Sequence, residues 1–395
     1  MFTFEDFELD TARYELRHDG AVVHVEPQVF DVLVQLVANS DRVVTKDEML
    51  QSVWGHRFVG DSALTSRIKA ARRAIGDDGQ AQRLIRTVHG RGYQFIGDAE
   101  RVSLEPEEPQ LEQTVGYCWT PDRDRIAYAS MGAGPPLVKA ANWMTHLGFD
   151  LVSPVWRHWL QGLSEQHSLL RYDELGCGLS DWDATDYSLD AWVQHLETVV
   201  DANGLDRFPL LGISQGGAVA IEYTVRHPER VTHLILYGAY GRGRLQRATT
   251  EQQRREAAID LELAQLGWGR NDDSFMQVFT MQFLPDGTRE QWDAFNELQR
   301  RTTPPDNAVQ FLRAFADINV IDSAARVSRP TLILHATDEL RVPFSAAQEL
   351  AATIPDSELI ALDSKNHILI EDEPAWPRFL DEVDTFLAPT PSERS

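Results

Sequence analysis

The sequence predicts two folded parts of different class, a smaller α+β part followed by a larger α/β part. In residues 1–97, short β-branched runs precede helical patterns and a final hairpin pattern. From residue 114 to residue 387, continuous apolar runs alternate with helical patterns, which is typical of a mostly parallel sheet covered by helices. Residues 98–113 are acidic, contain two prolines and lack periodicity, so they are expected to be a linker.

The charge is unevenly distributed along the 395 residues, whose formal net charge is −24. This balance excludes a protein that is basic throughout and coats nucleic acid, but it does not exclude a local DNA contact. Residues 61–97 hold seven basic and three acidic residues. No uncharged apolar run is long enough to span a membrane, and the acidic N-terminus is unlike a signal peptide. We therefore expect a cytoplasmic protein.

Within the first part, the elements follow in a clear order. Residues 2–25 read as short strands joined by turns, and Pro27 stands at the start of a helix. Thr45 and Glu48 have the spacing of a capping box, which opens a second helix. Asp61 is expected to cap a third helix, which Gly76 ends. The last pattern, over residues 83–96, predicts a hairpin.

The third helix has one apolar face and one face of Ser, Lys and Arg side chains. Such a face suits a DNA major groove, where cations meet phosphates and hydroxyls approach bases. Arg91 lies between glycines at the expected hairpin turn, which suits a narrow minor groove. The alternative is a solvated charged helix beside an ordinary hairpin.

Three stretches resemble the winged-helix DNA-binding domain of the OmpR/PhoB class of transcription regulators. They read ELRHDG, VWGHRFVGDSALTSRIKAARRAIGDDG and IRTVHGRGYQFIG. The resemblance implies double-stranded DNA as a partner and action in pairs, hence a homodimer. It carries DNA contacts over to Trp54, Ser62, Ser66, Lys69, Arg72, Arg73, Thr87, His89 and Tyr93. Charge and position add Arg67 and Arg91.

The second part contains eight candidate strands. They cover residues 114–119, 125–130, 136–142, 168–173, 208–213, 232–238, 331–336 and 358–363. The first two strands, joined by a short turn, are expected to form an antiparallel hairpin. Residues 241–326 interrupt the sheet pattern with apolar residues at helical spacing. Residues 388–395 are expected to be a C-terminal tail.

A G-x-S-x-G motif centred on Ser214 stands between the fifth strand and a helix. Glycines permit a tight turn there, and the turn holds the serine hydroxyl out at the sheet edge. The serine needs a base to take its proton. Asp338 and His367 each follow a later strand, in the expected order of acid and base. Glu339 and Asp363 are the alternative acids.

These motifs make residues 114–387 resemble the α/β-hydrolase superfamily. The matching stretches include LLRYDELGCGLSDW, LLGISQGGAVAIEYTVRHPERVTHLILYG and LILHATDELRVPF. The resemblance implies a catalytic triad of Ser214, Asp338 and His367, and a helical lid over residues 241–326 that makes an apolar pocket. It carries the first oxyanion donor over to the backbone N–H of Gln215. The usual His-Gly pair is replaced by residues 141–144, where Trp143 is the candidate second donor.

Two functions are compatible with this organisation. The first is a one-component transcription regulator whose hydrolase-fold domain senses, and in one version hydrolyses, a small apolar or acyl-bearing ligand. The second is an active serine hydrolase for an ester, thioester or carbon–carbon bond, with an appended DNA-binding module. A third reading, a hydrolase fold that only dimerises, is disfavoured by the apparent triad. No metal-ligand spacing and no phosphate-binding loop is found in the sequence, so no cofactor or metal is expected.

Overall fold

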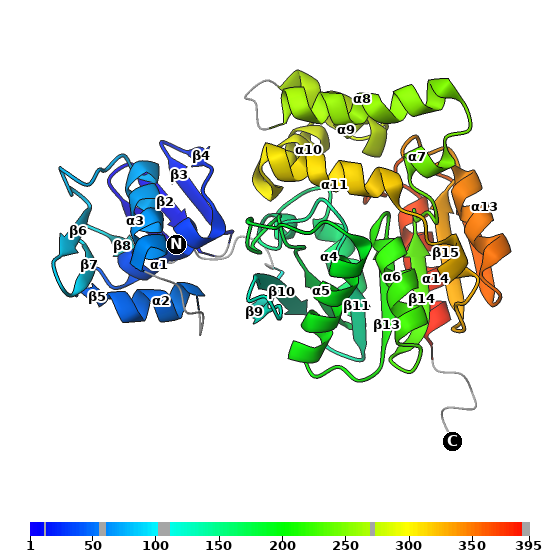
Figure 1. The fold of residues 1–395 in the computed structure, drawn as a ribbon, viewed down its shortest axis with the longest axis horizontal. Helices are drawn as coiled ribbons and strands as arrows, with labels where there is room; N and C mark the ends of the chain where they lie inside the picture. The colour runs from blue at the N-terminus through cyan, green and yellow to red at the C-terminus, as the bar shows by residue number, and fades with distance from the viewer. Residues whose placement is uncertain (12, 55–60, 102–110, 269–272, 389–395) are drawn as a thin grey trace. The chain divides into compact units, whose positions relative to one another are not determined.

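The computed structural model describes residues 1–11, 13–54, 61–101, 111–268 and 273–388 (Figure 1). The chain divides into two compact units, Met1–Gln110 and Leu111–Ser395. Each unit has its own hydrophobic core of buried side chains.

The first unit contains three helices and two antiparallel sheets in its described residues. One sheet has the order β4-β3-β2-β1-β8 and the other has the order β5-β7-β6. The strands are β1 (Phe2–Phe4), β2 (Phe7–Asp10), β3 (Glu15–His18), β4 (Ala21–Val23), β5 (Val44–Thr45), β6 (Ile85–Val88), β7 (Gly92–Phe95) and β8 (Glu100–Arg101). The helices are α1 (Pro27–Ala38), α2 (Lys46–Trp54) and α3 (Asp61–Ala74). This arrangement is a winged helix with β6 and β7 as the wing.

Local signals in the sequence account for these elements. Pro27 is the first residue of α1. The backbone N–H of Glu48 donates to Thr45 Oγ1 at 3.2 Å and the N–H of Thr45 donates to Glu48 Oε2 at 2.7 Å, so the predicted capping box is present. The apolar stripe of α3 is buried in the core, with Leu64 and Ala71 fully inaccessible to solvent.

Arg72 joins α3 to the wing. Its guanidinium is buried and donates to the carbonyl of Ile85 at 2.8 and 3.1 Å and to Thr87 Oγ1 at 2.8 Å. Asp77, just after α3, accepts the N–H groups of Leu84 and Ile85 at 3.0 and 2.9 Å. Burial raises the pKa of Asp77, but these backbone donors outweigh it and hold the pKa below its ordinary value. The position of the wing on α3 therefore depends on buried polar contacts.

Both ends of the expected linker belong to the folded units. Strand β8 pairs antiparallel with β1, with Arg101 opposite Phe2. Gln113 donates to the carbonyl of Leu147 at 2.9 Å and accepts from Arg171 at 2.8 Å. Residues 102–110, the middle of the expected linker, lie outside the described residues.

The second unit is built on a single sheet of eight strands in its described residues, in the order β16-β15-β14-β13-β11-β12-β10-β9. These are β9 (Thr114–Trp119), β10 (Arg125–Met131), β11 (Pro136–Lys139), β12 (Ser168–Tyr172), β13 (Phe208–Ile213), β14 (Val231–Tyr237), β15 (Thr331–Ala336) and β16 (Ser357–Leu362). Strand β10 is antiparallel to β9 and β12, and the remaining pairs are parallel. All eight predicted strands are confirmed, as is the first hairpin.

Helices connect these strands, and one group of them forms an inserted layer between β14 and β15. The connecting elements are η1 (Phe149–Leu151), α4 (Arg157–Glu165), α5 (Leu189–Ala202), α6 (Gly216–Arg226), α13 (Phe344–Thr353) and α14 (Ala375–Leu387). The inserted helices are α7 (Arg244–Arg247), α8 (Glu251–Gly267), α9 (Asp273–Phe283), α10 (Arg289–Thr302), α11 (Pro305–Asp317) and α12 (Ile321–Ala324). Figure 1 shows α8, α9, α10 and α11 grouped together beyond one end of the sheet. We call α7 to α12 the lid.

Among the described residues, no helix has both the length and the apolar character needed to cross a membrane.

The buried contacts of Arg72 predict a stability effect. Replacement of Arg72 by Ala leaves the Ile85 carbonyl without its donor, which we expect to cost about 1.5–3 kcal/mol in the free energy of unfolding of the first unit. Its exposed neighbour is the matched control, since Arg73→Ala should change that free energy by less than about 0.5 kcal/mol. Hydrogen exchange of the amides of residues 85–88 in the intact chain measures both effects. Equal exchange in the two variants would contradict the structural role of Arg72.

Candidate functional site

Ser214 stands at a tight turn between β13 and α6. Its φ is +53°, in the left-handed region that non-glycine residues rarely adopt, and its N–H donates to the carbonyl of Tyr237 at 2.9 Å. A Cβ on Gly212 would lie 2.6 Å from Cα of Gly217, so only glycine fits at this crossing of strand and helix. The predicted strand–turn–helix geometry around Ser214 is confirmed, and it holds the serine on the wall of a pocket.

His367 is buried in the loop that follows β16. Its backbone N–H donates to the carbonyl of Phe283, at the end of lid helix α9, at 2.8 Å. A Cβ on Gly238 would lie 3.0 Å from Cε1 of the His367 ring. Gly238 directly follows Tyr237, whose carbonyl holds the Ser214 N–H, so these two residues bring the serine turn and the histidine ring to one place.

Glu339, and not Asp338, contacts His367, and the sequence expectation is corrected on this point. Nδ1 of His367 is hydrogen-bonded to Glu339 Oε2, and both side chains are almost inaccessible to solvent. Asp338 is exposed, and its backbone N–H donates to the carbonyl of Ser364 at 3.1 Å. Asp363, the other alternative acid, is also exposed. The sequence presents two adjacent acids after β15, and only the path of the loop decides which of them faces inward.

The surroundings of Glu339 keep it ionised. Burial raises the pKa of its carboxyl, but the charges and hydrogen bonds of His367 and His335 outweigh burial and hold the pKa below its ordinary value. His335 Nε2 lies 2.7 Å from the second carboxylate oxygen. A carboxylate on Nδ1 favours the tautomer that leaves Nε2 as an acceptor. Within the described part of the chain, Nε2 of His367 is buried and has no hydrogen-bond partner.

The two expected oxyanion donors line the same pocket as Ser214. Gln215 precedes the first turn of α6, where backbone N–H groups have no partner within the helix. Trp143 lies in the loop after β11. A Cβ on Gly216 would lie 2.7 Å from the carbonyl oxygen of Ala141, so this loop packs directly on the serine turn. Both donors are therefore next to Ser214, and their role in catalysis stays a prediction.

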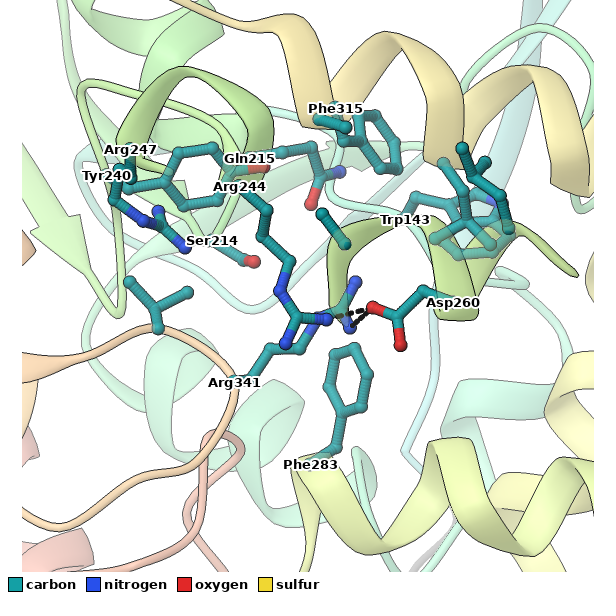
Figure 2. Close-up of a pocket in the computed structure, with 15 residues that line it drawn as sticks. Trp143, Ser214, Gln215, Tyr240, Arg244, Arg247, Asp260, Phe283, Phe315 and Arg341 are labelled. Carbon is teal, nitrogen blue, oxygen red and sulfur yellow. Dashed lines mark hydrogen bonds and ion pairs between the residues drawn. The ribbon is translucent and has the colours of Figure 1, made fainter. Parts of the chain in front are cut away.

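The pocket lies between the serine turn and the lid and has about 570 Å³ of empty volume, part of it open to solvent. Figure 2 shows Ser214, Arg244, Arg341 and Asp260 around one common space. Its apolar walls include Phe283 and Phe315. The pocket is also lined by three arginines and one aspartate, so the expectation of an apolar pocket is only partly correct. The charges were missed because the arginines come from segments far apart in sequence.

In the first unit, α3 presents a continuous exposed polar face. Ser62, Ser66, Lys69 and Arg73 are exposed along it. Among the described residues, Lys69 and Arg73 have no acidic partner. His89 and Arg91 are exposed at the tip of the wing. We call these six residues the DNA face.

The other expected DNA contacts are turned inward or bound within the unit. Trp54, Arg72 and Tyr93 are buried, so they are corrected from DNA contacts to parts of the core and of the wing attachment. Thr87 accepts the hydrogen bond from Arg72. Arg67 contacts Glu26 at 3.2 Å and donates to Gln28 at 3.0 Å, so it faces α1. The sequence pattern did not show that Trp54 and Tyr93 are buried, or that Arg67, Arg72 and Thr87 are bonded within the unit.

One group of possible metal ligands occurs in the described residues. Asp6, His18 and Asp19 offer ligand atoms within 4.8 Å of one another, and all three are exposed. Exposed acidic groups of this kind are common without a metal, and no other contact at this turn points to an ion.

Comparison with known families agrees with this geometry. The family model for the alpha/beta hydrolase fold matches residues 146–374, more than half of the chain. The family model for the transcriptional regulatory protein C-terminal domain matches residues 20–95. The chain belongs to the α/β-hydrolase fold family and carries a DNA-binding domain of the OmpR/PhoB type.

Individual relatives match one part of the chain or the other. A putative carbamate hydrolase, RutD, of Pseudomonas savastanoi is 26% identical over 222 residues, 54% of this chain and 82% of that protein. A 2-hydroxymuconate semialdehyde hydrolase of a Pseudomonas species is 36% identical over 111 residues, which cover 28% of this chain and 35% of the hydrolase. The transcriptional regulator HilA of Salmonella typhi is 35% identical over 109 residues, 28% of this chain and only 19% of the regulator.

Solved structures show the same fold as the second unit. A hydrolase from Pseudomonas aeruginosa covers 70% of this chain and 98% of its own, with a TM-score of 0.58 and 22% identity. The esterase RhEst1 from a Rhodococcus species covers 69% and 98%, with a TM-score of 0.56 and 24% identity. Because the sequence identities are 22% and 24%, these similarities show a shared fold and no more.

The contact between Glu339 and His367 predicts how the serine reacts. Glu339→Gln removes the charge that orients and stabilises the histidine, so we expect labelling of Ser214 by a fluorophosphonate probe to slow roughly 10³–10⁴-fold. Asp338→Asn is the matched control and should label at the wild-type rate, because Asp338 is exposed. The two rates are compared under identical conditions by mass spectrometry. If Asp338→Asn proved the slower variant, the acid would be Asp338 after all.

The DNA face predicts a salt-dependent contact. Lys69→Ala and Arg73→Ala should each weaken binding to duplex DNA and lower the slope of log affinity against log salt by about 1, as expected for one lost phosphate contact. Arg13→Ala is the control and should leave the slope unchanged, because Arg13 is an exposed arginine in the turn between β2 and β3, away from α3 in sequence. Fluorescence anisotropy at several salt concentrations measures the slope. An unchanged slope in the α3 variants would remove α3 from the interface.

Proposed function

We propose that the chain is a one-component transcription regulator whose second unit senses a small acyl compound bound at Ser214. The observation that carries the proposal is the presence, in one chain, of a helix with an exposed cationic face in the first unit and of a pocket with Ser214 on its wall in the second unit. The regulator would act where chromosomal DNA is, in the cytoplasm.

Contacts of the lid support a sensor. The lid forms part of the pocket wall, and its Phe283 carbonyl holds the backbone of His367. A compound that fills the pocket therefore contacts lid segments, and segments of this kind are the usual moving parts of such sites. A ligand changes DNA binding only if it has different affinities for the binding and non-binding states.

We further propose that the unit hydrolyses its ligand and so ends its own signal. The buried Glu339–His367 pair favours this second activity, because a domain that only binds has no need of an ionised acid behind an unpartnered histidine nitrogen. Relatives of the second unit include a putative carbamate hydrolase and a 2-hydroxymuconate semialdehyde hydrolase.

Pairing of two chains completes the proposal. Recognition helices of small DNA-binding domains commonly act in pairs on repeated half-sites, so the affinity depends on how two copies are spaced. A homodimer would convert a change at the lid into a change of this spacing.

Labelling of the pocket tests the sensor directly, because the fluorophosphonate occupies it covalently. We expect the labelled full-length protein to differ from the free protein by roughly 5–150-fold in affinity for DNA from upstream of its own operon. Mobility shift at fixed salt measures the difference.

Ser214→Ala is the control. This variant cannot be labelled, so its affinity for DNA should be the same with and without the probe. Equal DNA affinity of labelled and free wild-type protein would contradict the sensor. Labelling that persists in Ser214→Ala would contradict the choice of nucleophile.

A further inference from the structure

The charge of the Ser214 pocket is unexpected for a chain with a net charge of −24. Arg244 and Arg247 come from lid helix α7, and Arg341 comes from the loop after β15. Among the described residues that line this pocket, Asp260 of α8 is the only acid. The walls around the serine are therefore cationic.

Asp260 is fully engaged by two of these arginines. Arg341 Nη1 donates to Asp260 Oδ2 at 2.7 Å and to Gln282 Oε1 at 2.9 Å, and Arg244 donates to the same carboxylate oxygen. Burial raises the pKa of Asp260, but Arg341 and Arg244 outweigh it and hold the pKa below its ordinary value. The carboxylate is thus ionised, and its charge is already shared by two cations.

Arg247 is the arginine whose charge no carboxylate neutralises. Its Nη1 donates to the carbonyl of Arg242 at 2.7 Å, and its guanidinium lies 5.2 Å from the ring centre of Tyr240. No ion pair with an acid is formed by Arg247 within the described residues. Glu339 acts on it only through space, because that carboxylate is held by His367 and His335.

A half-buried guanidinium without a counter-ion is partly desolvated, and an anion bound beside it would offset part of this cost in free energy. The planar guanidinium matches a carboxylate in geometry as well as in charge. We propose that the compound bound at Ser214 carries a free carboxylate, held by Arg247, in addition to the acyl group that faces the serine. This inference rests on the proposed function, since it names the substrate class of the same site.

The contacts of the arginines favour a carboxylate over a phosphate. Three arginines and one aspartate leave a net charge of +2, but Asp260 holds Arg244 and Arg341, so Arg247 is the guanidinium of the described lining that contacts no carboxylate. A phosphate monoester carries nearly two charges at neutral pH, so it would also have to compete with Asp260 for Arg244 and Arg341. The assigned substrate class is therefore an ester of a dicarboxylic acid with one carboxylate free.

The hydrolysis of such a half-ester balances with the groups present. Ser214 Oγ bonds to the acyl carbon while its proton passes to Nε2 of His367, which then gives the proton to the leaving alcohol. Water then attacks the acyl carbon while one of its protons passes to Nε2 of His367, the bond between the acyl carbon and Ser214 Oγ breaks, and His367 gives this proton to Oγ as the dicarboxylic acid leaves. Arg247 binds the distal carboxylate throughout and takes part in neither proton transfer.

Two chromogenic esters of equal shape test the assignment on the full-length protein. One is the mono-para-nitrophenyl ester of glutarate, and the other is its neutral monoamide. We expect the wild type to prefer the anionic ester by roughly 10-fold or more in kcat/KM. Arg247→Gln should remove most of this preference, and Arg247→Lys should retain part of it.

Arg255→Gln is the matched control. Arg255 lies on lid helix α8 with an exposed side chain, does not line the pocket, and should keep the full preference. Loss of the preference in Arg255→Gln as well as in Arg247→Gln would show a general effect of lid charge and would overturn the role of Arg247.

Calorimetry with Ser214→Ala separates this inference from hydrolysis. We expect glutarate to bind, its monoamide to bind at least 10-fold more weakly, and Arg247→Gln to abolish the difference.

The combined outcomes separate the two proposals. If glutarate binds but neither ester is cleaved, the proposed hydrolase activity is contradicted and the carboxylate site is supported. If both esters are cleaved equally, the carboxylate site fails and the hydrolase stands. Tighter binding of glycerol phosphate than of glutarate, or no binding of either, would overturn the assignment.

Discussion

The close crossing of β13 and α6 at Ser214 is the constraint on which the second unit depends. The positive φ of Ser214 and the contact of Gly212 with Gly217 leave no room for a side chain at either glycine. Once the chain turns there, Gln215 is placed at the start of α6, and Gly216 packs against the loop that carries Trp143. The neighbouring strand then brings Gly238 beneath His367. Nucleophile, base and both candidate donors thus follow from one backbone crossing.

The lid is joined to this centre by polar contacts. Phe283 accepts the N–H of His367, and Asp286 donates its N–H to Asn366 at 3.1 Å. Arg341 links the loop of Glu339 to Asp260 on α8. A movement of the lid must therefore disturb the loops of both His367 and Glu339. These contacts connect the wall of the pocket to the loops of His367 and Glu339, which suits the proposed site that both senses and reacts.

Much of the fold could be predicted because its signals are local. The capping pair Thr45–Glu48, the proline that starts α1 and the wing hairpin are encoded by residues close in sequence. The eight strands of the second unit are apolar runs of the expected length, and the turn at Ser214 is marked by its own glycines. The inward orientation of Glu339, the internal bonds of Arg72 and the charge of the pocket depend on partners far along the chain, so no pattern of spacing could reveal them.

The sequence by itself determined the two fold classes, their order, the nucleophile turn, the histidine and the cationic helix. Each of these is fixed by residue type, periodicity or a short motif. Tertiary structure alone decided which acid meets His367, because the loop after β15 turns Glu339 inward and leaves Asp338 in solvent. It also decided which arginines are available, since Arg72 is bound to Ile85 whereas Arg73 is exposed beside it. The physical reason is the same in both cases: a buried charge must be paired, and the partner is chosen by packing and not by distance along the chain.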